Sequence, residues 1–85
     1  MQQVWKYEIP ENESAIKMPI CAQILSADFQ GDAAYVWALV DIDAAPTQRK
    51  VIVRGTGHNI RSENLLFIQT IFHGSLVFHV FEDLG

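Results

Sequence analysis

Short apolar segments separated by turn residues constrain this chain more than any other feature. Residues 4–9 show the pattern most clearly, because Trp5, Tyr7 and Ile9 fall on one face of an extended chain and two charged residues fall on the other. No segment repeats hydrophobic residues at helical spacing over three turns. The pattern therefore predicts an all-β chain.

Further segments with the same character are predicted to be strands: residues 15–18, 20–29, 35–42, 50–54, 65–72 and 76–81. Gln30-Gly31-Asp32 and His73-Gly74-Ser75 are short enough to form tight hairpins. One short helical turn is allowed near residues 60–64. The prediction is a small antiparallel meander of six to seven strands, closed as a barrel or a sandwich.

The length and composition limit what such a chain can be. With 85 residues, it forms a single β domain over residues 1–85, because two cores would each be too small to offset chain entropy. A hydrophobic content of 49% excludes a disordered tail, and no apolar run approaches the roughly 20 residues that cross a bilayer. The formal charge of −4 argues against a duplex nucleic-acid partner, and no membrane partner is expected.

Two of the predicted strands, residues 35–42 and 65–72, are apolar on both faces and must be covered on both sides. A domain this small buries few such strands alone. Either a closed barrel supplies a dense core, or one apolar face or sheet edge is an interface between copies. We expect a homo-oligomer.

The single cysteine, Cys21, excludes an intramolecular disulfide and favours a cytosolic protein. The start of the chain does not resemble a signal peptide. Because Cys21 lies between Ile20 and Ala22, we expect its thiol to be buried and unreactive.

The charge is unevenly distributed along the chain. Residues 1–43 contain two lysines and seven acids, a net charge of −5, and residues 63–85 contribute three more acids. Residues 44–62 contain no acid and carry four cations, Arg49, Lys50, Arg54 and Arg61. An acidic chain therefore has one local basic segment.

Within the basic segment, Arg54-Gly55-Thr56-Gly57-His58-Asn59 combines groups that suit a phosphate. Two glycines allow successive backbone N–H groups to converge on an anion, Arg supplies a planar fork, and His supplies a switchable donor. The predicted ligand-binding residues are Arg54, Gly55, Thr56, Gly57, His58, Asn59 and Arg61. The alternative is a turn or bulge whose cations protect an exposed sheet edge.

Other chemistry has little support in the sequence. Trp5, Tyr7, Tyr35 and Trp37 are available for stacking on a ligand, although such residues are more often core. His79, between Phe78 and Val80, is expected to be partly buried and hydrogen-bonded. No nucleophile motif or metal-ligand spacing is present, so we expect no enzyme, metal or cofactor.

Four motifs in order resemble a family of small uncharacterised proteins of tailed phages and prophages. They are Trp5-Lys6-Tyr7-Glu8-Ile9-Pro10, Trp37-Ala38-Leu39-Val40-Asp41, Gly55-Thr56-Gly57-His58 and Leu76-Val77-Phe78-His79-Val80-Phe81-Glu82. The resemblance implies a phage accessory protein that acts in the host bacterial cytoplasm. It implies no site residues, because the family has no assigned activity.

The leading expectation is a non-enzymatic phage protein that counteracts a bacterial defence by sequestering a small, phosphate-bearing nucleotide signal. An alternative is an acidic inhibitor or accessory module that binds a host defence protein through residues 1–43. A third possibility is a virion-associated structural protein.

Overall fold

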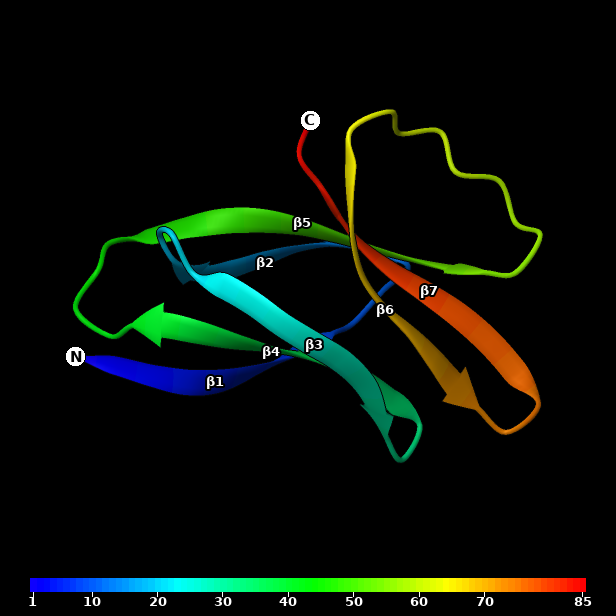
Figure 1. Cartoon of the computed structure of the whole chain (residues 1–85), viewed down its shortest axis with the longest axis horizontal. Coiled ribbons are helices and arrows are strands. Elements are labelled where there is room, and N and C mark those ends of the chain that lie inside the picture. Colours follow the sequence, from blue (N-terminus) through cyan, green and yellow to red (C-terminus); the bar gives the residue numbers. More distant parts are fainter.

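The computed structural model describes residues 1–85 and contains seven strands in two sheets that pack face to face (Figure 1). It has no helix, and hence none long and apolar enough to span a membrane. The strands are β1 (Gln2–Ile9), β2 (Glu13–Pro19), β3 (Gln23–Gln30), β4 (Ala33–Asp41), β5 (Pro46–Gly55), β6 (Leu65–His73) and β7 (Leu76–Asp83). The predicted all-β class is confirmed, and the architecture is a small sandwich. The helical turn allowed near residues 60–64 is absent, because these residues belong to the irregular β5–β6 loop.

One sheet has the order β1-β4-β3 and the other the order β2-β5-β7-β6, and all neighbours are antiparallel. Tight turns at Gly31 and Gly74, both with positive φ, close the predicted β3–β4 and β6–β7 hairpins. The remaining pairings join strands that are distant in the chain, so the order is not that of a simple meander. At one side of the sandwich, β3 and β6 run side by side as the edges of different sheets (Figure 1).

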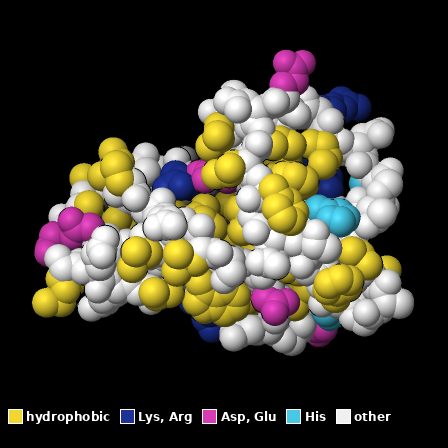
Figure 2. Space-filling model, viewed as in Figure 1, with side chains coloured by type: hydrophobic (Ala, Val, Ile, Leu, Met, Phe, Trp, Pro, Cys, Tyr) yellow, Lys and Arg dark blue, Asp and Glu magenta, His cyan; other side chains and the backbone are white.

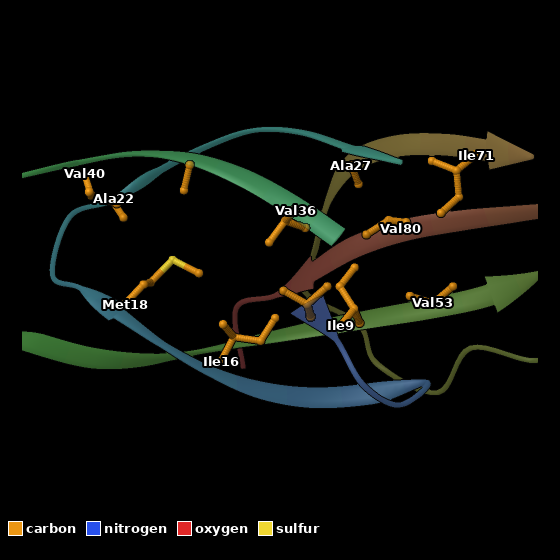
Figure 3. Packing of buried hydrophobic residues seen from close by; sticks show 12 residues of the cluster. Ile9, Ile16, Met18, Ala22, Ala27, Val36, Val40, Val53, Ile71 and Val80 are labelled. Atoms are coloured by element: carbon orange, nitrogen blue, oxygen red, sulfur yellow. The ribbon is translucent and has the colours of Figure 1, made fainter. Parts of the chain in front are cut away.

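The core lies between the two sheets. Figure 3 shows Val36 and Val40 of β4 pointing toward Met18 and Ile16 of β2, with Val80 of β7 further along the same layer. These side chains are almost completely buried because strand alternation directs them inward from both sheets. The twelve core residues are Ile9, Ile16, Met18, Ala22, Ala27, Val36, Ala38, Val40, Val51, Val53, Ile71 and Val80.

A β-bulge alters the face that β3 presents. The register with β4 shifts between Ile24 and Ser26, which leaves Leu25 exposed. The simple alternation expected over residues 20–29 places Ala22 and Ala27 on opposite faces, and this is wrong. The extra residue of the bulge restores Ala27 to the core beside Ala22.

The outer face of β4 is also different from expectation. Tyr35, Trp37 and Leu39 are half-buried, so the prediction that this strand is covered on both sides is wrong. Neighbouring side chains of the same sheet shield them instead. The Tyr35 and Trp37 ring centroids are 6.3 Å apart, and Lys6 Nζ lies 4.7 Å from the Tyr35 centroid.

Cys21 is exposed rather than buried. It lies in the turn between β2 and β3 and has a φ of 64°, the only positive φ of a non-glycine residue. This left-handed conformation turns the chain sharply after Pro19, and the side chain is directed out of the sandwich while the following Ala22 enters the core.

Candidate functional site

The predicted basic loop lies at the end of β5, where it faces the β1–β2 turn. Arg54, His58 and Asn59 line one open hollow of about 570 Å³. The β1–β2 turn supplies the rest of the lining, which is polar throughout: Glu11, Asn12 and Glu13. Three of the seven predicted ligand-binding residues therefore share one concavity.

Arg54 is already held by protein groups. Its Nε donates to the Asn59 carbonyl at 3.2 Å, and its Nη1 donates to the carbonyls of Asn12 at 3.1 Å and Val53 at 3.0 Å. Its Nη2 donates to Glu13 Oε1 at 2.9 Å. A guanidinium has five N–H groups, so one remains for a ligand. Arg54 therefore ties the β1–β2 turn to the loop after β5 and keeps part of its donor capacity.

The two glycines do not form the predicted nest of free backbone donors. The amide of Thr56 donates to the Val77 carbonyl at 3.2 Å, and the amide of His58 donates to the Gly55 carbonyl at 3.0 Å. Gly55 has another role, because a Cβ there would lie 2.9 Å from Cε1 of the His58 ring. Gly57, with a φ of 86°, provides the left-handed turn that returns the chain toward the hollow.

Besides the two glycines, Thr56 and Arg61 also lie outside the lining of the hollow. The Thr56 hydroxyl pairs with Nε2 of His79 at 2.8 Å, and Nδ1 of the same ring pairs with the Thr70 hydroxyl at 3.0 Å. His79 is thus half-buried and hydrogen-bonded, as predicted. Arg61 is exposed further along the loop and is not part of the lining.

An apolar pocket of about 330 Å³ adjoins the polar hollow. Its hydrophobic walls include Ile9, Phe29, Val53 and Phe78, at the open end of the sandwich between the two sheets. The Phe29 and Phe78 rings meet edge to face with centroids 5.7 Å apart. The pocket and the hollow share Glu11 and Asn12, so they lie next to each other, and we refer to them as two chambers.

Sequence reasoning missed both phenylalanines of the pocket. The aromatic residues considered for stacking, Trp5, Tyr7, Tyr35 and Trp37, line neither chamber. Phe29 and Phe78 each lie close to a hairpin turn, which is a local signal for the end of a sandwich. Only the packing of the two sheets against each other shows that the β3–β4 and β6–β7 hairpins meet.

Carboxylates surround both chambers. Glu8, Glu11 and Asp32 line the apolar pocket, and Glu11 and Glu13 line the polar hollow. Arg54 is the only Lys or Arg side chain in either lining, and His58 lies beside it in the hollow. A bare inorganic phosphate therefore meets repulsion at this site. A larger ligand with hydroxyl or amino donors can use the carboxylates as acceptors.

The described residues 1–85 contain no cluster of three or more His, Cys, Asp or Glu side chains that could hold a metal ion. His73 and His79 have different partners: Nε2 of His73 lies 3.0 Å from Asp32 Oδ1, whereas His79 pairs with the hydroxyls of Thr56 and Thr70.

Comparison with known proteins gives one match. A family described as a Domain of unknown function (DUF7352) matches residues 1–84 of the chain. No curated protein and no solved structure matches it.

Proposed function

The chain belongs to the DUF7352 family, and we propose that it is a non-enzymatic binding protein for a small, phosphate-bearing nucleotide. One observation carries the proposal: a pocket with Phe29 and Phe78 in its lining adjoins, across Glu11 and Asn12, a polar hollow lined by Arg54 and His58. The two volumes, about 330 and 570 Å³, are typical of sites for small ligands.

Each part of a nucleotide has a matching surface. A flat base fits against Phe29 and Phe78, whose rings meet edge to face and together offer an apolar surface. Glu11 and Asn12, at the junction, can accept from ribose hydroxyls or donate to them. Arg54 and His58 then lie on the side where a phosphate would follow. The arrangement favours the whole nucleotide over its separate parts.

Glu13 opposes the binding of the phosphate. Its carboxylate pairs with Arg54 Nη2 at 2.9 Å and so occupies the cation that the ligand needs. The Glu13 side chain is 54% exposed, which lets it swing into solvent when a phosphate competes. Removing its charge should therefore strengthen the binding.

The test is titration calorimetry with a panel of cyclic dinucleotides, ADP-ribose-type signals and inorganic phosphate. Glu13→Gln should tighten nucleotide binding by about 2- to 5-fold, since an exposed ion pair is worth roughly 0.2–1 kcal/mol. Asp43→Asn is the matched control: it removes one charge from an exposed aspartate in the β4–β5 turn, at the other end of the sandwich (Figure 1). His58→Ala should weaken binding.

If no nucleotide of the panel binds measurably, the proposal is overturned. So would inorganic phosphate that binds as tightly as the nucleotides overturn it, because the apolar pocket would then contribute nothing.

The resemblance to phage proteins supplies a setting for such binding. A phage protein that captures a host nucleotide signal in the bacterial cytoplasm would counteract the defence that depends on that signal. The protein would act by stoichiometric sequestration, which needs no catalytic group.

A second candidate function is binding of a basic surface on a host protein. It is favoured by the carboxylates of Glu8, Glu11, Glu13 and Asp32, which gather around the same end of the sandwich. Affinity capture from host lysate at two salt concentrations separates the two functions. A protein retained in stoichiometric amount at low salt and lost at high salt supports this candidate.

A further inference from the structure

We infer that a second copy of this chain covers an apolar surface centred on β6. This β6 surface is defined by Leu66, Phe67, Phe72 and Leu76, together with Leu25 on the neighbouring strand β3. The inference goes beyond the proposed ligand site, because none of these residues lines either of its chambers.

The strand β6 differs from the other edge strands of the sandwich. Each of the others carries charged residues, which discourage pairing with further chains: Lys6 and Glu8 in β1, Glu13 and Lys17 in β2, and Asp28 in β3. The nine residues of β6 include no Lys, Arg, Asp, Glu or Pro. The β6 edge therefore lacks the usual protection.

The side chains of β6 are correspondingly exposed. Phe72 is 64% exposed, Phe67 57% and Leu66 53%, and Leu76 beside the hairpin turn is 57% exposed. Phe67 and Phe72 lie on the outer face of the four-stranded sheet, where they pair with Phe81 and Val77 of β7. Hydrophobic groups are visible over β6 and over β3 in Figure 2.

The size of this surface fits a dimer. Its five defining side chains lie on both sides of the β6 edge, with Phe67 and Phe72 on the outer face and Leu66 on the face toward β3. Together they expose on the order of 400 Å² or more, as much as the largest apolar patch of a typical monomer. A standard interface buries about 800 Å² per partner, of which about 60% is apolar. The β6 surface supplies most of that apolar share, and Gln69 and Thr70 lie on the same strand to supply polar contacts.

The surface also combines a recess with exposed side chains beside it. A cleft of about 500 Å³ separates the first half of β6 from β3, and its walls include Ile24, Leu25, Leu66, Phe67 and Ile68. A two-fold interface must carry both a protrusion and a recess on one patch, because the same patch is used twice. The exposed Leu66 and Phe67 lie beside the recess that a partner's Leu66 and Phe67 would enter.

The charge at this surface favours an identical partner over an oppositely charged one. Arg49 and Glu82 lie at the floor of the cleft, where Arg49 Nη2 donates to Glu82 Oε1 at 2.9 Å and Nη1 donates to the Ala22 carbonyl at 2.7 Å. Figure 2 shows a basic and an acidic group side by side between the two hydrophobic regions. Because this pair neutralises itself, it presents no net charge to a second copy. The acid nearest the surface is Asp28 of β3, which lines a neighbouring hollow together with Phe72.

Sedimentation velocity of the full chain over micromolar to high micromolar concentrations tests the inference. The expected species has twice the mass of the 9.6 kDa chain. Leu66→Glu and Phe72→Glu should each raise the dissociation constant by about tenfold or more, since a buried hot-spot residue is worth over 1.4 kcal/mol. Val4→Glu, at an equally exposed valine of β1, is the control and should leave the dimer intact.

Circular dichroism melting establishes that each variant is folded, and Leu76→Glu replaces any variant that is not. A wild-type chain that stays monomeric at every concentration overturns the inference. A dimer that survives the folded variants of the β6 surface, or that Val4→Glu breaks equally well, overturns it too. Neither result bears on nucleotide binding, which is measured separately by calorimetry.

Discussion

At the scale of single residues, Tyr7 buries a polar group that has no hydrogen-bond partner in the chain. Its hydroxyl is the one buried side-chain polar atom of residues 1–85 in this position. Burial also raises the pKa of the phenol, because the charged form is poorly solvated there. The ring itself packs against the core from β1. The ring therefore contributes to stability and the hydroxyl opposes it.

Tyr7→Phe is expected to stabilise the fold by about 1 kcal/mol, because leaving a buried polar group unpaired costs roughly 1–3 kcal/mol. Urea denaturation measures the change. Tyr35→Phe is the matched control, since this ring lies half-buried on the outer face of β4, and its free energy of unfolding should change little. A clear loss of stability in Tyr7→Phe would contradict the prediction by revealing a partner for the hydroxyl.

At the scale of elements, the β6–β7 hairpin depends on its turn. Gly74 has a φ of 61°, and a Cβ there would meet no other atom, so the constraint at this position is conformational and not steric. Gly74→Val should destabilise the fold by about 1–2 kcal/mol, the cost of a left-handed conformation for a residue other than glycine. Gly74→Asn should cost less, because Asn tolerates this conformation.

Thermal denaturation of the two variants provides the comparison. Equal losses for Val and Asn would show that the backbone conformation at Gly74 is not the cause.

The hairpins and the strand positions follow from the sequence because their signals are local. A two-residue turn with glycine and a run of alternating side chains both act over fewer than ten residues or so. The bulge at Leu25 has no such signal, since it depends on how β3 meets β4. For the same reason, the exposure of Cys21 could not be inferred from its apolar neighbours.

The candidate site was predicted only in part. Arg54, His58 and Asn59 were identified because acid-free, glycine-containing sequence around them is unusual in an acidic chain. Their partners Glu11 and Glu13 come from a segment some 40 residues earlier, and the aromatic pocket comes from two more. The pairing of β2 with β5 brings Glu13 to the basic loop, the pairing of β5 with β7 brings Phe78, and the packing of the two sheets brings Phe29.

At the scale of the whole molecule, most pairing joins distant parts of the chain. Gln2 pairs with Asp41, Glu13 with Ile52, and Lys50 with Asp83. Closing such loops costs entropy before the contacts are gained, and folding is correspondingly slow. We expect refolding in milliseconds to seconds, with the β3–β4 and β6–β7 hairpins formed early.

Stopped-flow fluorescence of Trp5 and Trp37 can follow this refolding. The protein concentration should be low enough that the refolding rate no longer depends on it. Gly74→Val should slow refolding more than it accelerates unfolding, because the β6–β7 hairpin is early. Refolding in microseconds, or an effect confined to the unfolding rate, would contradict this order of events.

The ion pair of Arg49 and Glu82 also selects one alignment of the four-stranded sheet. Both side chains point between the sheets, and Arg49 lies diagonally across from Glu82, which is opposite Val51. The pair raises the pKa of Arg49 mainly through its hydrogen bonds. If β5 slipped by one residue, Arg49 would face outward and Glu82 would be left buried without a counter-charge, at a cost of several kcal/mol. A contact that adds little net stability thus excludes misaligned sheets and preserves the edge on which a second chain can build.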